Sequence, residues 1–195
     1  RALRIAWSNT EGQYPEEIPK GHSRLYVADL DYSSGAPRLA NKKQVAQSDS
    51  LDCRIEAQDF YDNETKLIYT CYRPGDKAEV MGLDLKTGLT TNFSQSSGTY
   101  NEPEGIFPDG QHTLVEADRQ GNGAGSRYVD IWKLKLDGSG RNFERLTHFT
   151  DYEGYKSSNP VVSTDGKMMA FQVAMTKDEA GVGYGILLYH FEKKR

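Results

Sequence analysis

The sequence predicts an all-β protein built from four-stranded antiparallel blades of a β-propeller, and three observations support this prediction. Short stretches of alternating apolar and polar residues recur along the chain, bounded by Gly, Pro, Asn and Asp. Apolar spacing typical of helices is nearly absent. The expected third strand of each unit ends at Leu30, Leu85, Leu136 and Phe191, with spacings of 55, 51 and 55 residues. Repeats of this length are typical of propeller blades.

Each expected strand is a short apolar run that ends at a turn signal. The clearest of these runs are residues 3–7, 24–30, 67–72, 80–85, 113–117, 129–136, 168–173 and 185–191. Asp109-Gly110 and Asp165-Gly166 stand between a short strand and a stronger one, and Asp62-Asn63 holds the equivalent place earlier. A tight hairpin needs positive φ, which Gly and Asn adopt at little cost, so these pairs are expected to be structural.

The repeat divides the chain unevenly. Blades at about 52–94 and 100–149 have four strands, whereas 1–47 lacks the innermost strand and 158–191 lacks the outermost strand. Residues 1–195 therefore form one partial propeller of about 3.5 blades, and we expect it to be the C-terminal part of a longer propeller. A closed four-bladed ring is the less favoured interpretation. A third interpretation is that two copies associate through their open blade edges.

Composition and charge exclude some partners. The 195 residues are 36% hydrophobic, and the net charge of −4 provides no bulk attraction for nucleic acid. No apolar stretch approaches the roughly 20 residues that a membrane span requires. The chain begins at Arg1 without a recognisable signal peptide, and we expect that its natural start has been removed.

The two cysteines, Cys53 and Cys71, are too few for a disulfide framework and lack the spacing of a zinc site. On neighbouring antiparallel strands they would lie close together. The alternative is a pair of partly buried free thiols, and the sequence leaves both possibilities open.

Several segments resemble the WD40-like (PD40) repeat of TolB-like β-propellers. Residues 145–149 read Arg-Leu-Thr-His-Phe, and residues 159–171 contain Asn-Pro, then Ser-Thr-Asp-Gly-Lys, then an apolar strand ending in Ala-Phe. Residues 102–110 resemble the same segment one blade earlier, and residues 55–69 resemble a third copy whose turn departs from the pattern. The resemblance implies a propeller of six or seven blades and a periplasmic or extracellular location. It says little about activity.

Candidate site residues lie on or just before the innermost strands, because these strands line the central channel of a propeller. Glu102 and Glu104 stand two residues apart, so on a strand their side chains point the same way. Such a pair suits acid/base chemistry or a shared cation; the alternative is a pair of hydrogen-bonded or exposed acids. The full set of candidate ligand-binding residues is Glu56, Asp59, Tyr100, Asn101, Glu102, Glu104, Tyr155 and Asn159.

No cofactor, metal site or catalytic residue is predicted. The four histidines are dispersed, without the spacing of a metal motif, and no Gly-x-Ser-x-Gly elbow is present. A peptidase activity would therefore need another domain.

Three functional hypotheses follow, and whether the chain is an enzyme stays open at this point. The leading one is a non-catalytic binding module that presents a channel mouth to a protein or an oligosaccharide. The alternative is a carbohydrate-active enzyme, a polysaccharide lyase or glycoside hydrolase, that uses Glu102, Glu104 and their neighbours. The third is a propeller domain that gates a separate hydrolase domain.

Overall fold

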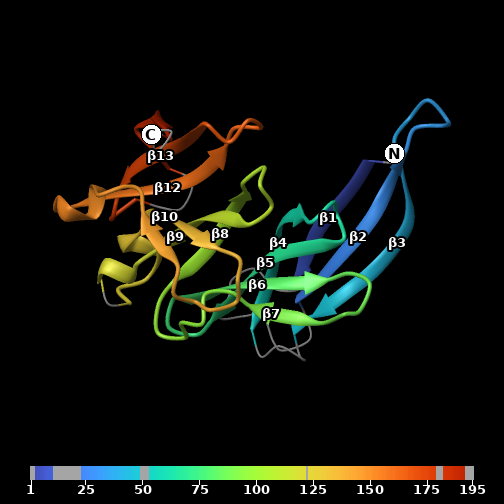
Figure 1. Cartoon of the computed structure of the whole chain (residues 1–195), viewed down its shortest axis with the longest axis horizontal. Coiled ribbons are helices and arrows are strands. Elements are labelled where there is room, and N and C mark those ends of the chain that lie inside the picture. Colours follow the sequence, from blue (N-terminus) through green and yellow to red (C-terminus); the bar gives the residue numbers. More distant parts are fainter. Residues whose placement is uncertain (1–2, 11–22, 49–52, 122, 179–181, 192–195) are drawn as a thin grey trace.

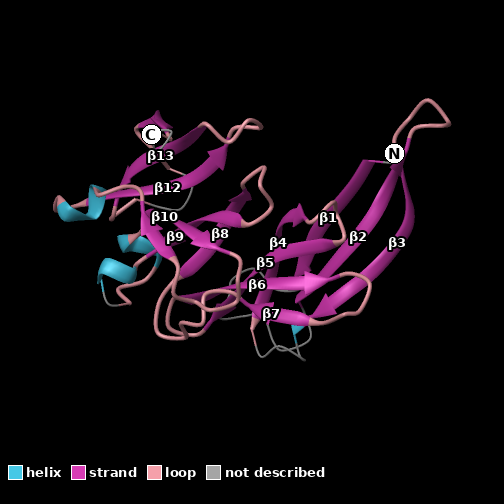
Figure 2. Cartoon of the chain, in the orientation of Figure 1, coloured by secondary structure: helices cyan, strands magenta, loops and turns pink. Residues whose placement is uncertain are grey.

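The computed structural model describes residues 3–10, 23–48, 53–121, 123–178 and 182–191 (Figure 1). They form four antiparallel sheets in chain order, with strand orders β1-β2-β3, β4-β5-β6-β7, β8-β9-β10-β11 and β12-β13-β14. The strands are β1 (Leu3–Thr10), β2 (Ser23–Asp31), β3 (Arg38–Gln47), β4 (Arg54–Tyr61), β5 (Lys66–Arg73), β6 (Lys77–Asp84), β7 (Thr90–Asn92), β8 (Asn101–Ile106), β9 (His112–Ala117), β10 (Asp130–Lys135), β11 (Phe143–Arg145), β12 (Tyr155–Val162), β13 (Met168–Met175) and β14 (Gly185–His190). Strands and loops make up nearly all of the described residues (Figure 2), with short 3-10 helices in connections such as η3 (Arg119–Gly121), η4 (Ser126–Tyr128) and η5 (Phe149–Asp151).

This architecture confirms the predicted all-β fold of an incomplete propeller. The expected third strands end at Asp31, Asp84, Lys135 and His190, each next to the predicted position. The sheets of β1–β3 and β12–β14 lie at opposite ends of the row of sheets (Figure 1). Among the residues that the structure describes, no helix is long and apolar enough to cross a bilayer.

The core consists of apolar layers between successive sheets. The first layer joins Leu25 of β2 to Ile55 and Leu67 of the second sheet. The second layer joins the second and third sheets, and the third layer packs Leu114 and Ile131 against Met169 and Phe171. Because each sheet buries one face against its neighbour, the sheets stabilise one another as the blades of a propeller do.

The Asp-Gly turns adopt the backbone that the sequence predicts. Gly110 and Gly166 have φ values of 65° and 69°, which glycine adopts without the steric penalty of a Cβ. At the equivalent earlier turn, Asp62 and Asn63 have φ values of 51° and 55°. Asparagine and aspartate are the non-glycine residues that tolerate positive φ best. This explains how Asp62-Asn63 forms the turn without a glycine.

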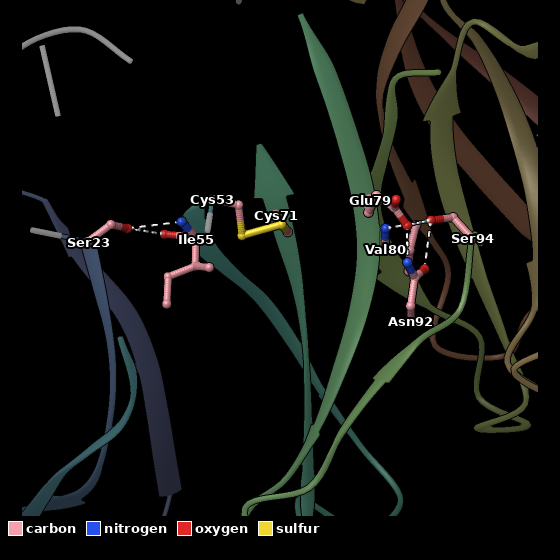
Figure 3. The surroundings of a disulfide bond; sticks show 8 residues. All are labelled: Ser23, Cys53, Ile55, Cys71, Glu79, Val80, Asn92 and Ser94. Carbon is pink, nitrogen blue, oxygen red and sulfur yellow. Dashed lines mark hydrogen bonds between the residues drawn. A yellow bond between two sulfur atoms is a disulfide. The ribbon is translucent and has the colours of Figure 1, made fainter. Parts of the chain in front are cut away.

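The same hydrogen bond occurs in each of the first three sheets. A Ser or Thr hydroxyl just after the last strand accepts it from a backbone amide of the preceding strand. Ser48 accepts a hydrogen bond from the amide of Ser23 on β2 (3.2 Å). In the second sheet, Ser94 accepts one from the amide of Val80 on β6 (3.1 Å) (Figure 3). In the third sheet, Thr147 accepts one from the amide of Ile131 on β10 (2.8 Å). The contact therefore aligns β2 with β6 and β10.

The structure answers the question about the cysteines. Cys53, directly before β4, and Cys71 on β5 form a disulfide bond with a Cα–Cα distance of 5.4 Å (Figure 3), which lies in the usual range. It ties the start of β4, the first strand of the second sheet, to the neighbouring strand β5. Close by, Ser23 of β2 donates to the carbonyl of Ile55 (2.8 Å) and accepts from its amide (3.0 Å). These contacts fix the second sheet against the first.

Candidate functional site

A β-bulge interrupts the first strand of each of the last three sheets. The register shifts between Ala57 and Asp59 in β4, between Pro103 and Gly105 in β8, and between Ser158 and Val161 in β12. Bulges re-aim side chains and are frequent next to functional sites. Here the bulged residues are Gln58, Glu104 and the pair Asn159-Pro160, so the same device places polar groups at equivalent positions in three sheets.

Glu102 of β8 is the centre of the polar cluster at these bulges. Its carboxylate accepts hydrogen bonds from the hydroxyls of Tyr72 on β5 and Tyr100 directly before β8. Gln58 of β4 also donates to it (3.4 Å). Withdrawal from water raises the pKa of Glu102, and the two tyrosine hydroxyls oppose this effect. The same burial, reinforced by the carboxylate, raises the pKa of both tyrosines, which therefore remain hydrogen-bond donors.

Glu104 and Glu116 complete a group of three neighbouring carboxyls. Glu116 of β9 lies directly opposite Glu102 in the strand register and accepts a hydrogen bond from the backbone amide of Asn159 in the next sheet. Burial and, to a lesser extent, neighbouring glutamates together raise the pKa of Glu104 to about 9 and that of Glu116 to about 8. Lys156, itself buried, acts in the opposite direction on Glu116. We call Glu102, Glu104 and Glu116 the carboxyl cluster.

Three other predicted residues, Glu56, Asn101 and Tyr155, have different surroundings. Glu56 of β4 pairs with Arg54 (3.3 Å) and contributes to the raised pKa of both Glu102 and Glu104. Asn101 is fully buried and bonds to Thr99 Oγ1 (2.7 Å), as expected of a structural side chain. Tyr155 is 45% exposed at the start of β12.

Asp59 lines a separate cleft of about 710 Å³ at the turns between the first two strands of the second and third sheets. It accepts hydrogen bonds from the amides of Phe60 (2.7 Å) and Ile106 (3.4 Å). Partial burial raises its pKa, and no glutamate of the carboxyl cluster contributes to that shift. Asp59 therefore lies in different surroundings from Glu102, although each belongs to the first strand of its sheet.

Neither Tyr72, which donates to Glu102, nor Glu116 was among the predicted site residues. They belong to β5 and β9, the second strands of their sheets, rather than to the first strands. Glu116 does carry a sequence signal, because it is the one charged residue of the strand His-Thr-Leu-Val-Glu-Ala, five of whose six residues are buried. A buried carboxyl within such an apolar strand needs a specific environment, and the register supplies one beside Glu102.

The described part of the chain contains no group of three or more His, Cys, Asp or Glu side chains that is positioned to hold a metal ion. Within the carboxyl cluster, Glu102 and Glu116 accept hydrogen bonds from neighbouring residues. With pKa values of about 9 and about 8, Glu104 and Glu116 retain protons at neutral pH, which removes the repulsion that three buried carboxylates would otherwise have.

We expect the stability of the folded protein to fall as pH rises from about 5 to about 9. The folded-state pKa values of Glu104 and Glu116, about 9 and about 8, lie above the ordinary value of 4.5. The folded protein therefore holds protons that the unfolded chain releases, and stability present at low pH is lost as pH rises through the folded-state values. Each proton held only by the folded state contributes a slope of about 1.4 kcal/mol per pH unit. Urea titrations across this pH range measure the slope.

Glu104→Gln tests this assignment. An amide keeps the size of the protonated carboxyl but never ionises, so the variant should be more stable than wild type at pH 9 and nearly equal to it at pH 5. Glu144→Gln, at an exposed position of β11, is the matched control and should leave the pH profile unchanged. An identical profile for wild type and Glu104→Gln would contradict the raised pKa of Glu104.

No protein-family model and no curated protein matches this sequence, but solved structures share its fold. TolB from Acinetobacter baumannii matches with a TM-score of 0.53 and 18% identity over 96% of this chain. Putative TolB from Agrobacterium tumefaciens matches with a TM-score of 0.57 and 15% identity over 91% of the chain. A prolyl endopeptidase matches with a TM-score of 0.55 and 13% identity over 87% of the chain.

The chain spans 50%, 72% and 26% of those three structures, respectively. At such low identity the similarity shows the fold alone, which is that of a TolB-like β-propeller present in part.

Proposed function

We propose that this chain is a non-catalytic propeller binding module whose carboxyl cluster contacts a protein or glycan partner. The observation that carries the proposal is the convergence of three sheets at equivalent bulges. Gln58 of the second sheet donates to Glu102 of the third (3.4 Å), and the amide of Asn159 in the fourth sheet donates to Glu116. Polar groups on rigid strands of three sheets form a preorganised surface, which favours binding.

The chemistry of the cluster favours a neutral, hydrogen-bonding ligand. A protonated carboxyl donates one hydrogen bond and accepts others, whereas ionised carboxylates only accept. Peptide amides and sugar hydroxyls offer both donors and acceptors, so both match a cluster in which Glu104 is protonated at neutral pH. Tyr155, 45% exposed on the neighbouring sheet, provides an aromatic surface of the kind that stacks on sugars and peptides.

The test is binding to an array of neutral and acidic oligosaccharides and to a library of extended peptides. The double variant Glu102→Gln/Glu104→Gln should lose about tenfold or more in affinity for whichever probe the wild type binds, because the pattern of donors and acceptors changes. The matched control Glu144→Gln/Glu153→Gln alters two exposed glutamates outside the cluster and should bind as wild type. Equal affinity of the double variant and the wild type would contradict a role for the cluster, and a wild type that binds no probe would count against the proposal.

A carbohydrate-active enzyme is the second candidate, and the protonation of Glu104 is the observation that favours it. A carboxyl with a pKa of about 9 suits a general acid beside a second carboxyl that accepts a proton. Incubating wild type with the same oligosaccharides and following new reducing ends or unsaturated products distinguishes the two. Turnover that disappears in Glu104→Gln, with binding retained, would favour the enzyme.

A propeller that gates a separate hydrolase domain is the third candidate, and the similarity to part of a prolyl endopeptidase is the observation behind it. A hydrolase domain elsewhere in the same gene product would favour this candidate.

We also propose that the first sheet lacks its innermost strand and the last sheet its outermost strand. The hydroxyl contact that aligns β2 with β6 and β10, the third strands of the second and third sheets, supports counting β1, β2 and β3 as the second to fourth strands of their blade. The direct succession of β3 and β4 supports this order. A periplasmic or extracellular location is proposed as well, and the disulfide supports it because such bonds persist in oxidising compartments.

A further inference from the structure

The chain contains the same sheet-to-sheet contact three times. One face of each sheet, carrying alternate residues of its strands, packs on the opposite face of the next sheet. In the third contact, Leu114 of β9 and Ile131 of β10 are fully buried against Met169 and Phe171 of β13. The first and second contacts bury Leu25 of β2 and Ile68 of β5 in the same way. We call the face of a sheet that packs on the next sheet along the chain its leading face, and the opposite face its following face. In each of the three contacts, a leading face packs on a following face.

The last sheet has a face equivalent to these leading faces, and its large apolar side chains on β12 and β14 remain exposed. Cross-strand partners share a face, so Val161, Ala170 and Leu188, which are paired in register across β12, β13 and β14, lie together on the side opposite Phe171. Val161, Leu188 and the neighbouring Ile186 are 57%, 64% and 77% exposed. We call Val161, Met168, Ala170, Ile186 and Leu188 the tail face.

The first sheet presents the complementary following face, which is also uncovered. Leu3, Ile5 and Trp7 of β1 pair with Leu30, Ala28 and Tyr26 of β2, on the side opposite Leu25. Leu39 of β3 pairs with Leu30 and extends the apolar surface. Leu3 and Leu39 are 62% and 52% exposed, and Trp7 stacks on Tyr26 with ring centroids 5.4 Å apart. We call Leu3, Ile5, Trp7, Tyr26, Leu30 and Leu39 the head face.

We propose that a second copy of this chain covers the tail face with its own head face. Continuity with the three internal contacts supports this occupant, because in each of them a leading face packs on a following face. A second copy supplies such a face, and the two faces lie at opposite ends of the row of sheets (Figure 1). Contiguous apolar surfaces of this kind are uncommon on monomers and mark association sites. The interface is head-to-tail, so each copy contributes a different surface.

The test is the molar mass in solution, measured by sedimentation velocity across micromolar to submillimolar concentrations. Wild type should show a mass above that of one copy, increasing with concentration. Leu188→Glu in the tail face and Ile5→Glu in the head face should each weaken association at least tenfold, because a charge would be buried at the contact. Leu89→Glu is the control, since Leu89 is 71% exposed in the turn before β7 and outside both faces, and it should leave the mass unchanged.

Mixing the variants tests the head-to-tail geometry. Ile5→Glu retains an intact tail face and Leu188→Glu an intact head face, so an equimolar mixture should recover dimers that neither variant forms alone. Far-UV circular dichroism confirms that each variant is folded, and Leu188→Ala with Ile5→Ala provides milder alternatives if it is not. A wild type that stays monomeric throughout overturns the proposal and points to another occupant for both faces. Loss of association in one variant only, or a mixture that recovers nothing, overturns the head-to-tail arrangement.

Discussion

Replacing Asp130 with alanine is expected to lower the free energy of unfolding by about 3–5 kcal/mol. Asp130 is fully buried at the start of β10. One carboxylate oxygen accepts hydrogen bonds from Thr147 Oγ1 (2.9 Å), Ser157 Oγ (3.2 Å) and the amide of Phe149 (2.9 Å). The other accepts from Arg145 Nη2 (2.6 Å) and Thr150 Oγ1 (2.5 Å).

The large effect follows from what the substitution leaves behind. Alanine removes the acceptor but not its donors, and a buried donor without a partner costs more than the net value of the bond it made. Arg145 is the last residue of β11 and Thr147 follows it, whereas Ser157 belongs to β12 of the next sheet. Asp130 therefore connects the last strand of the third sheet to the first strand of the fourth, and its loss should loosen β12 and the bulge that carries Asn159.

Urea denaturation followed by tryptophan fluorescence measures the change, because Trp132 lies on the same strand. Asp137→Ala is the matched control: Asp137 lies in the exposed hairpin after β10 and accepts from the amide of Ser139 (2.9 Å) and from Asn142 (2.6 Å). Its removal should leave the midpoint nearly unchanged, because water replaces these contacts. Asp130→Asn, which keeps one acceptor oxygen, should fall between wild type and alanine. Equal midpoints for Asp130→Ala and Asp137→Ala would refute the structural role of Asp130.

The strands could be predicted from the sequence because their pattern depends on local chemistry. Alternation of apolar and polar residues placed the ends of the third strands beside Asp31, Asp84, Lys135 and His190. Turn residues such as Gly110 satisfy a local backbone requirement that is visible in the sequence. The disulfide was not predictable in the same way, because the distance between Cys53 and Cys71 depends on which strands pair.

The candidate site was only partly predictable, because bulges and cross-strand register decide which side chains meet. Glu102 and Glu104 follow from their place on an innermost strand. Glu116 joins them because β8 pairs with β9 in a register that sets Glu116 opposite Glu102. The bulge at Gln58 changes the alternation of β4, so Glu56 and Asp59 pair with Thr70 and Ile68 and lie on the same face of the sheet. Regular alternation would place two residues three apart on opposite faces. One irregular residue shifts every side chain after it, and no local pattern reports it.

Reducing the disulfide between Cys53 and Cys71 is expected to destabilise the protein by about 3 kcal/mol. The two cysteines are separated by 18 residues, and a cross-link over a loop of this length removes about that much chain entropy from the unfolded state. Urea denaturation of wild type with and without reductant measures the change. The double variant Cys53→Ala/Cys71→Ala is the control: it should resemble reduced wild type and should not respond to the reductant. Identical oxidised and reduced midpoints, or two titratable thiols in the unreduced unfolded protein, would contradict the bond.

The size of this effect also bears on where the protein works. Domains are typically stable by only about 5–15 kcal/mol, so a loss of about 3 kcal/mol raises the unfolded fraction more than a hundredfold. The bond closes the start of β4, the strand that carries Glu56 and Gln58 toward the carboxyl cluster. A reducing compartment would therefore weaken the strand that supports the candidate site, whereas an oxidising one preserves it. If reduction lowers both the urea midpoint and ligand affinity, while the double alanine variant shows the reduced values in either condition, the disulfide links the compartment to binding.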